Sequence, residues 1–354
     1  MSNRIVHIDV AKGIGILLVV LGHNWIVLHE RGELYRVIYS FHMPLFFLLS
    51  GIFFNPAKPL LVTLIEKADS ILKPYFITML AAEIVYRLLG PQEISLPVSL
   101  FGIFYGTANL IRWGIPWFLP HLFALFIFAW LVIRATKLEQ RTLLFKIILL
   151  AVLLTAGYLT VGNFMKTSII LNGEEVKLRG LPFSADIIPI TGFYFLLGRL
   201  LGRQISNMKP NSLLLCGSLV LFFTLHYFTN YQTNLNLRRY DNLVISTALA
   251  LLGVYSTLTI SVFISKFKAF AKPLAGFGMN SLIILLFHYP IQSGLFQFMG
   301  DYSPRKFVVG LMAFAATALI TLGLAKIIRW VKPLAWLYLP FKKQTRAGRQ
   351  RVAS

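Results

Sequence analysis

The stretch "HIDVAKGIGILLVVLGHN" (7–24) is apolar overall but carries Asp9, Lys12, His23 and Asn24. At ~100° and ~1.5 Å per residue, Lys12 and His23, eleven positions apart, lie within about 20° of one helix face and about 16 Å apart along it. Asp9 is near enough to Lys12 to pair with it. Ionisable side chains in an apolar span are functional candidates. The alternatives are that Lys12 reaches the inner headgroups and that His23 only makes an interhelical hydrogen bond.

Three more histidines, His42, His121 and His288, fall near the same end of other apolar segments, so we expect the four to lie at similar depth. Histidine titrates near neutral pH and, as a general base, accelerates a reaction ~100- to 10,000-fold. The sequence contains no His-x-x-x-His spacing, so we expect no metal. It also contains no Gly-x-Ser-x-Gly motif, which favours direct attack by an acceptor hydroxyl over a covalent enzyme intermediate.

Glu83 is an acidic residue in another apolar segment, with Arg87 one helical turn later. The spacing predicts an ion pair between them. The alternative hypothesis is that Glu83 orients or charges a histidine.

The composition defines the elements that position these side chains. Hydrophobic residues make up 57% of the chain and charged residues 13%, with a mean hydropathy of +0.71. These values predict an all-α, polytopic membrane protein. We expect about ten transmembrane helices, at 8–29, 37–54, 74–90, 115–134, 144–162, 186–202, 212–229, 243–264, 276–298 and 307–330. A weaker segment, 96–111, is re-entrant or lies at the interface.

The distribution of the 34 basic residues predicts that both termini are cytoplasmic, as in a multi-pass protein of the cell inner membrane. We expect one membrane domain (1–335) and a basic tail (336–354) that contacts anionic lipid. Nucleic acid is excluded as a partner because the basic residues are not gathered into a stripe with aromatic residues. The single cysteine, Cys216, excludes an internal disulfide. The oligomeric state is left open.

A short loop stretch, "TSIILNGEEVKLRG" (167–180), has Asn172-Gly173 between two β-prone runs. This pattern predicts a β-hairpin. It either covers a site from the outer face or is an ordinary solvated loop.

Several motifs together resemble the acyltransferase-three family of integral membrane acyltransferases, in particular its fucose 4-O-acetylase-like branch. Lys12 and His23 are similar to the basic-x10-His pattern of that family, although lysine stands where many members have arginine. The other matching stretches, in chain order, are "FHMPLFFLLSGIFF" (41–54), "ILKPYF" (71–76), "PWFLPHLFAL" (116–125) and "SLIILLFHYP" (281–290). The resemblance covers roughly residues 1–330. We expect the stand-alone form of the family, without a fused extracytoplasmic domain.

This resemblance implies transfer of an acyl group, usually acetyl, from cytoplasmic acyl-CoA to a hydroxyl of a glycan or glycolipid acceptor. Acyl-CoA is a co-substrate, and no cofactor or metal is implied. The candidate residues are His23 as base with His42 and Glu83 as further catalytic residues, Lys12, Lys67 and Lys73 for acyl-CoA, and Asn24, Trp117, His121 and His288 for the acceptor. A transporter or flippase of a lipid-linked sugar, and a structural membrane protein, are the alternative hypotheses.

Overall fold

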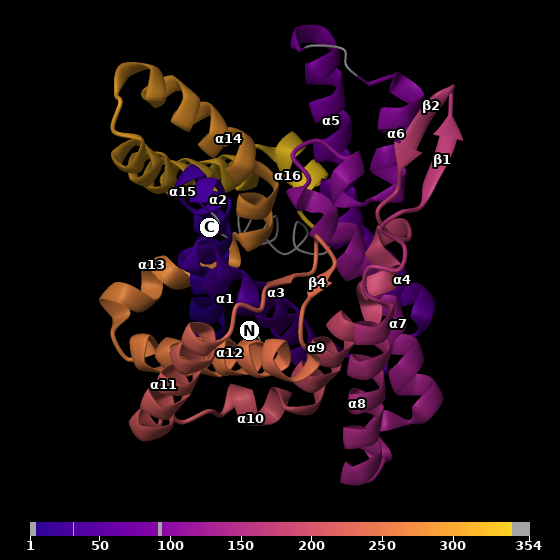
Figure 1. Cartoon of the computed structure of the whole chain (residues 1–354), viewed down its shortest axis with the longest axis vertical. Helices are drawn as coiled ribbons and strands as arrows, with labels where there is room; N and C mark the ends of the chain where they lie inside the picture. The colour runs from indigo at the N-terminus through magenta and orange to yellow at the C-terminus, as the bar shows by residue number, and fades with distance from the viewer. Residues whose placement is uncertain (1–4, 31, 91–93, 342–354) are drawn as a thin grey trace, which may run out of the picture. The chain divides into compact units, whose positions relative to one another are not determined.

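The computed structural model describes residues 5–30, 32–90 and 94–341, which fold almost entirely into helices (Figure 1). The α-helices are α1 (Val6–Gly22), α2 (Trp25–Glu30), α3 (Glu33–Ile52), α4 (Leu60–Lys67), α5 (Lys73–Leu89), α6 (Leu96–Tyr105), α7 (Phe118–Thr136), α8 (Leu143–Thr160), α9 (Ile188–Leu200), α10 (Gly202–Ser206), α11 (Ser212–Phe228), α12 (Leu243–Ser265), α13 (Lys268–Met279), α14 (Ser281–Tyr302), α15 (Lys306–Trp330) and α16 (Lys332–Tyr338). The strands are β1 (Ser168–Leu171), β2 (Glu174–Lys177), β3 (Thr233–Asn234) and β4 (Arg239–Tyr240).

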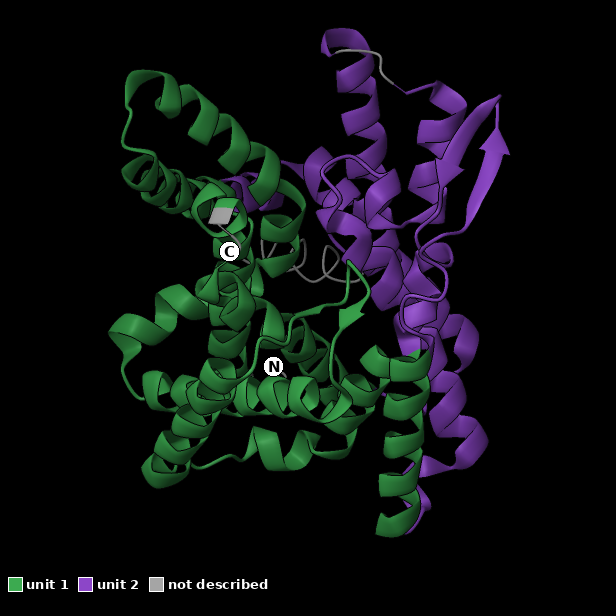
Figure 2. Ribbon diagram, viewed as in Figure 1, with its two compact units in different colours: residues 1–54, 143–159, 189–323 green, residues 55–142, 160–188, 324–354 purple. Residues whose placement is uncertain are grey.

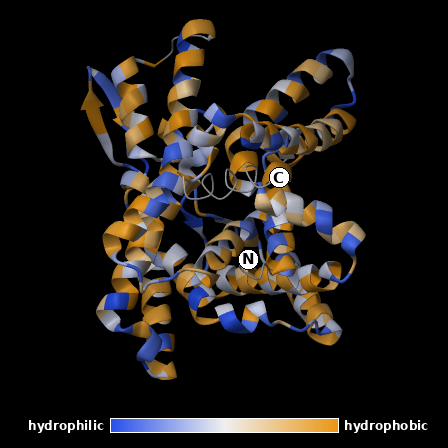
Figure 3. Ribbon diagram, turned by 180° about the vertical axis from the view of Figure 1, so that it is seen from behind, coloured by the Kyte–Doolittle hydropathy of each residue, from blue (hydrophilic) through white to orange (hydrophobic). Residues whose placement is uncertain are grey.

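Six helical segments within the described residues are long and apolar enough to cross a membrane: Ile115–Thr136, Leu143–Thr160, Pro182–Leu200, Leu243–Ser265, Ser281–Tyr302 and Lys306–Trp330. Figure 3 shows that hydrophobic residues make up long stretches of the helices. The all-α membrane fold is therefore confirmed. The other four predicted spans fall on α1 with α2, α3, α5 and α11, which are shorter or more polar, so the count of ten stays a prediction.

The predicted segment 96–111 contains α6, a helix of 10 residues that is too short to span a bilayer. The ninth predicted span also differs in its start. We expected 276–298, but α13 ends at Met279 and α14 begins at Ser281. The Asn280 side-chain amide donates to the Gly276 carbonyl at 2.7 Å, which satisfies a carbonyl at the end of α13.

Contacts between residues divide the chain into two interleaved units (Figure 2). Unit 1 contains 1–54, 143–159 and 189–323, and unit 2 contains 55–142, 160–188 and 324–354. Within the predicted tail 336–354, residues 342–354 lie outside the described residues. The tail boundary stays a prediction.

Helix α1 lies at the centre of unit 1, against α3, α12, α13 and α14. Glycines allow its closest approach to a neighbour. A β-carbon on Gly13 would lie 2.0 Å from the Leu274 carbonyl oxygen of α13, and one on Gly278 would lie 2.0 Å from the Asp9 carbonyl oxygen of α1. Small residues at such crossings let membrane helices pack backbone against backbone. The same device brings α3 against α9, at Gly51 and Gly198.

The prediction of one continuous helix over 8–29 is wrong. Helix α1 ends at Gly22, and α2 begins at Trp25. The Asn24 side-chain oxygen accepts a hydrogen bond from the Ile26 backbone N–H at 3.0 Å, as an asparagine at a helix N-cap does. Its side-chain amide donates to the Gly310 carbonyl of α15 at 2.9 Å. Asn24 is fully buried, so these two contacts hold the break in place.

The predicted hairpin is confirmed in unit 2. Strands β1 and β2 pair antiparallel, with Leu171 opposite Glu174. Asn172 and Gly173 both have positive φ, 52° and 79°, as the two central residues of a tight I′ turn require. Apolar side chains of the hairpin pack on α6, where Val176 meets Val98.

A five-residue π-helix, Ala68–Leu72, joins α4 to α5 in unit 2. Pro74 follows it and has no backbone N–H, so the α-helical hydrogen bond to the Ser70 carbonyl cannot form. The wider turn avoids the clash between the proline ring and that carbonyl.

The α1–α13 crossing gives a first prediction. Gly13→Ala should lower the free energy of unfolding by roughly 1–3 kcal/mol, the usual range for overpacking. Gly276→Ala on α13 is the matched control, because a β-carbon there meets nothing within 4 Å. Thermal unfolding of the two purified variants in detergent measures the difference. Equal midpoints would show that the crossing is not as close as described.

Candidate functional site

Three of the predicted site histidines belong to unit 1, on three helices. His23 follows the last residue of α1, His42 lies in α3 and His288 in α14. The rings of His23 and His288 have centroids 5.3 Å apart, with Nε2 of His288 3.4 Å from Nδ1 of His23. The Tyr39 ring lies between His23 and His42, with centroids 6.2 Å from His23 and 4.9 Å from His42. His42 and His288 are buried.

All three rings are oriented by the same local contact. Each Nδ1 lies at hydrogen-bond distance from the carbonyl four residues earlier: 2.8 Å from Val19 for His23, 2.8 Å from Ile38 for His42 and 2.9 Å from Ile284 for His288. A carbonyl oxygen only accepts, so in each neutral ring the hydrogen is on Nδ1 and Nε2 carries the lone pair. These are the tautomers in which Nε2 can take a proton.

Of the last four carbonyls of α1, that of Val19 keeps its helical donor, the His23 backbone N–H at 3.1 Å, and the other three lack one because the helix ends at Gly22. Other groups complete the set: Val19 also accepts from His23 Nδ1, Val20 accepts from the Gln292 side-chain amide at 3.0 Å, Leu21 from the Asn24 backbone N–H at 2.9 Å, and Gly22 from the Tyr39 hydroxyl at 3.3 Å. The side chains that satisfy the end of α1 are thus the histidine His23 and residues next to the other two histidines.

Lys12 and His23 both face α3. The Lys12 ammonium lies 6.0 Å from the ring centroid of Phe53, just past the end of α3, and His23 meets Tyr39 nearer its start. Fourteen helical residues separate Tyr39 from Phe53, or about 21 Å along the axis. These contacts agree with the shared face predicted from the spacing.

Sequence analysis did not single out Tyr39, Gln292 or Tyr289, whose ring centroid lies 6.4 Å from that of His23. Tyr39 precedes His42 by three residues and Gln292 follows His288 by four, spacings that place each beside its histidine on one helix face. This signal was available in the sequence. The Gln292 side-chain oxygen is buried and has no hydrogen-bond partner among the described residues, while its amide nitrogen donates to the Val20 carbonyl.

Glu83 belongs to unit 2 and makes the predicted ion pair. Its carboxylate lies 2.7 Å from Arg87 Nε and 3.1 Å from Arg112 Nε. The Glu83 side chain is only 4% exposed, against 23% and 19% for the two arginines. Arg112 also lies over the Tyr86 ring, with its guanidinium carbon 4.3 Å from the centroid. One buried carboxylate thus holds two cations together.

Three other predicted site residues of unit 2, Trp117, His121 and Lys67, contact aromatic rings or the backbone. The Trp117 and His121 rings have centroids 5.5 Å apart, and His121 Nδ1 donates to the Phe183 carbonyl at 3.1 Å. The Lys67 ammonium lies 3.6 Å from the Phe126 ring centroid. Trp117 and His121 are buried.

Lys73 ties the end of the described chain to the start of α5. Its ammonium lies 2.6 Å from the Asp69 carboxylate, 2.8 Å from the Leu339 carbonyl and 3.8 Å from the Phe341 ring centroid. Asp69 in turn accepts from the Phe341 backbone N–H at 2.9 Å. Acyl-CoA bound by Lys73 would have to compete with these partners.

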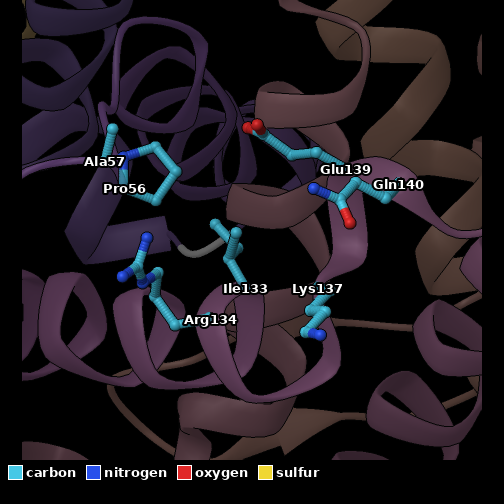
Figure 4. Close-up of a pocket in the computed structure, with 7 residues that line it drawn as sticks. All are labelled: Pro56, Ala57, Ile133, Arg134, Lys137, Glu139 and Gln140. Atoms are coloured by element: carbon cyan, nitrogen blue, oxygen red, sulfur yellow. The ribbon is translucent and has the colours of Figure 1, made fainter.

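A pocket of about 400 Å³ lies at the end of α7 in unit 2. It is lined by Pro56, Ala57, Ile133, Arg134, Lys137, Glu139 and Gln140. Figure 4 shows the Arg134 side chain extending toward Pro56 on one side of the pocket. Glu139 lies on the other side, and the Lys137 ammonium points away. Opposite charges across the space do not favour an anion such as a phosphate.

Among the residues that the structure describes, no group of three or more histidine, cysteine, aspartate or glutamate side chains is placed to hold a metal ion.

A family described as an acyltransferase domain matches residues 5–330, nearly the whole chain. The helical membrane fold thus belongs to an acyltransferase, and the chain is a member of the acyltransferase-three family expected from its motifs. No curated protein and no solved structure matches it.

The Glu83 cluster gives a second prediction. Glu83→Gln leaves Arg87 and Arg112 without their shared counter-charge and should lower the free energy of unfolding by roughly 1–3 kcal/mol. The matched control is Glu66→Gln, which removes the partner of Lys58 from a more exposed pair (28% and 43%) and should cost less than about 1 kcal/mol. Thermal unfolding of both variants measures the two losses of stability. If Glu83→Gln unfolds like the wild type but loses all acyltransferase activity, a catalytic role is favoured instead.

Proposed function

We propose that this protein transfers an acyl group, most simply acetyl, from cytoplasmic acyl-CoA to a hydroxyl of an extracytoplasmic or lipid-linked sugar. The observation that carries the proposal is the His23 tautomer: Nδ1 donates to the Val19 carbonyl, which leaves the Nε2 lone pair to accept a proton. Membership of an acyltransferase family supports the reaction class. The orientation predicted from charge supports a site in the cell inner membrane.

The reaction would proceed by direct attack. His23 Nε2 accepts the proton of the acceptor hydroxyl as its oxygen forms a bond to the thioester carbonyl carbon. The tetrahedral intermediate then expels the coenzyme A thiolate, which takes the proton from His23 Nε2. An O-acyl ester and free coenzyme A result, and His23 returns to its neutral form. A general base of this kind is worth ~100- to 10,000-fold in rate.

The donor would enter from the cytoplasmic side, where Lys12 attracts its phosphates. Lys67 and Lys73, which belong to unit 2, are separate candidates for contacts with acyl-CoA. Lys12 is supported most directly, because it faces α3 as His23 does, about a ligand's length away. The pantetheine arm is long and flexible, so the phosphates can stay with Lys12 while the thioester reaches His23.

The acceptor would come from the opposite side and meet the thioester beside His23. His42 carries its Nε2 lone pair in the same tautomer and lies against Tyr39, which also contacts His23, so we assign it to orienting the acceptor hydroxyl. Trp117 and His121 remain candidates for sugar contacts. Asn24 fixes the chain break next to the base through its contacts with Ile26 and Gly310.

The third prediction tests the base. His23→Gln should lower kcat by about 100-fold or more, because glutamine cannot take up the hydroxyl proton. His29→Gln, an exposed histidine on α2, is the matched control and should retain full activity. Release of free thiol from acetyl-CoA by membranes containing each variant measures the rate, at equal protein level. NMR of the surface glycan, with O-acetyl methyl signals, identifies the product.

Full thiol release by His23→Gln would remove the proposed base. No thiol release by the wild type with any acceptor would instead favour a transporter of a lipid-linked sugar.

The fourth prediction tests the donor side. Lys12→Gln should raise the KM for acetyl-CoA by about tenfold, corresponding to the ~1.5 kcal/mol of one charged contact. Its KM for S-acetyl-pantetheine, which lacks phosphates, should not change. Lys268→Gln, an exposed lysine at the start of α13, is the control. Equal increases for both donors would show that Lys12 does not contact a phosphate.

A further inference from the structure

The contact between His23 and His288 joins the end of α1 to α14. Nε2 of His288 lies 3.4 Å from Nδ1 of His23, with the ring planes inclined by 57°. His288 is fully buried. Water therefore does not reach the His288 side of this contact, and a hydrogen bond in such surroundings is electrostatically stronger than at a surface.

The direction of this hydrogen bond follows from the other partners of His288. Its Nδ1 lies 2.9 Å from the Ile284 carbonyl and 3.0 Å from the Leu285 carbonyl, and both oxygens only accept. The ring hydrogen is therefore on Nδ1, and Nε2 of His288 can only accept. The hydrogen on His23 Nδ1 is then shared between the Val19 carbonyl at 2.8 Å and His288 Nε2 at 3.4 Å.

We propose that His288 is a positioning residue for His23, and not a contact for the acceptor. The proposal rests on the proposed function above. A second acceptor on His23 Nδ1–H fixes the rotation of the ring and keeps the hydrogen on Nδ1, so Nε2 stays free to accept a proton. When Nε2 takes up the hydroxyl proton, His288 Nε2 stabilises the imidazolium through the same hydrogen bond. No proton leaves Nδ1 in this step.

A second contact between the same two helices fixes the height of His288. Gln292, one turn further along α14, donates to the Val20 carbonyl of α1 at 3.0 Å. Val20 is the neighbour of Val19, the other acceptor of the His23 hydrogen. The Val19 carbonyl thus accepts from His23, and the adjacent Val20 carbonyl accepts from Gln292 of α14. These two hydrogen bonds set where His288 meets His23.

The test compares two amides of different reach. In His288→Gln the side-chain oxygen occupies the place of Nε2 and can accept from His23. In His288→Asn the oxygen occupies the place of Nδ1 and falls short. We expect His288→Gln to keep kcat within about threefold of the wild type. His288→Asn should lose about 10- to 100-fold in kcat, as partners that orient a functional histidine typically do, with the KM values for acetyl-CoA and acceptor unchanged.

His226→Asn is the matched control, since His226 is a buried histidine of unit 1 that lies 3.4 Å from Ser40 and is not part of the site. Equal kcat for His288→Gln and His288→Asn would overturn the positioning role, and so would a raised acceptor KM at unchanged kcat. A wild-type protein that releases no thiol would overturn the proposed function itself, whereas active wild type with fully active His288→Asn overturns only the role of His288.

Discussion

A helix that ends inside an apolar environment must find donors for its last four carbonyls, and this requirement organises unit 1. Water is absent from the bilayer core, so each unpaired carbonyl would cost several kcal/mol. Helix α1 ends at Gly22, and its final carbonyls are satisfied by His23, Gln292, Asn24 and Tyr39. Two of these donors lie in the break itself and the other two come from α3 and α14, so both helices are held at the end of α1.

The same hydrogen bonds set the chemistry of the imidazole. Because His23 Nδ1 donates to the Val19 carbonyl, the lone pair of the neutral ring is on Nε2. Because α1 ends at Gly22, the His23 ring does not belong to a continuous helix. The buried Asn24 fixes the position of the break through its hydrogen bonds with Ile26 and Gly310. One arrangement thus satisfies the backbone and also suits the role of base that we propose for His23.

The sequence predicted those features that depend on local pattern. Apolar length gave the helical membrane fold, Asn172-Gly173 gave the hairpin, and spacing of four gave the Glu83–Arg87 pair. The motif of Lys12 and His23 indicated the family that the comparison shows.

Other features could not be predicted from the sequence, because they depend on contacts between distant residues or on helix breaks that do not change the apolar periodicity. Arg112 joins Glu83 from 29 positions away, and His288 meets His23 from 265 positions away. The helix breaks after Gly22 although apolar residues continue on both sides of the break. The sequence signal for the break was Asn24, because asparagine favours the N-cap of a new helix.

The most direct test of this account is the protonation of the two ring nitrogens of His23. NMR of the protein labelled with ¹⁵N-histidine, with the His23 signals assigned by their loss in His23→Gln, distinguishes the two neutral tautomers. We predict that the neutral ring carries its hydrogen on Nδ1 and that Nε2 is unprotonated. A His23 ring with its hydrogen on Nε2 would contradict the account, because the lone pair would then point into the end of its own helix.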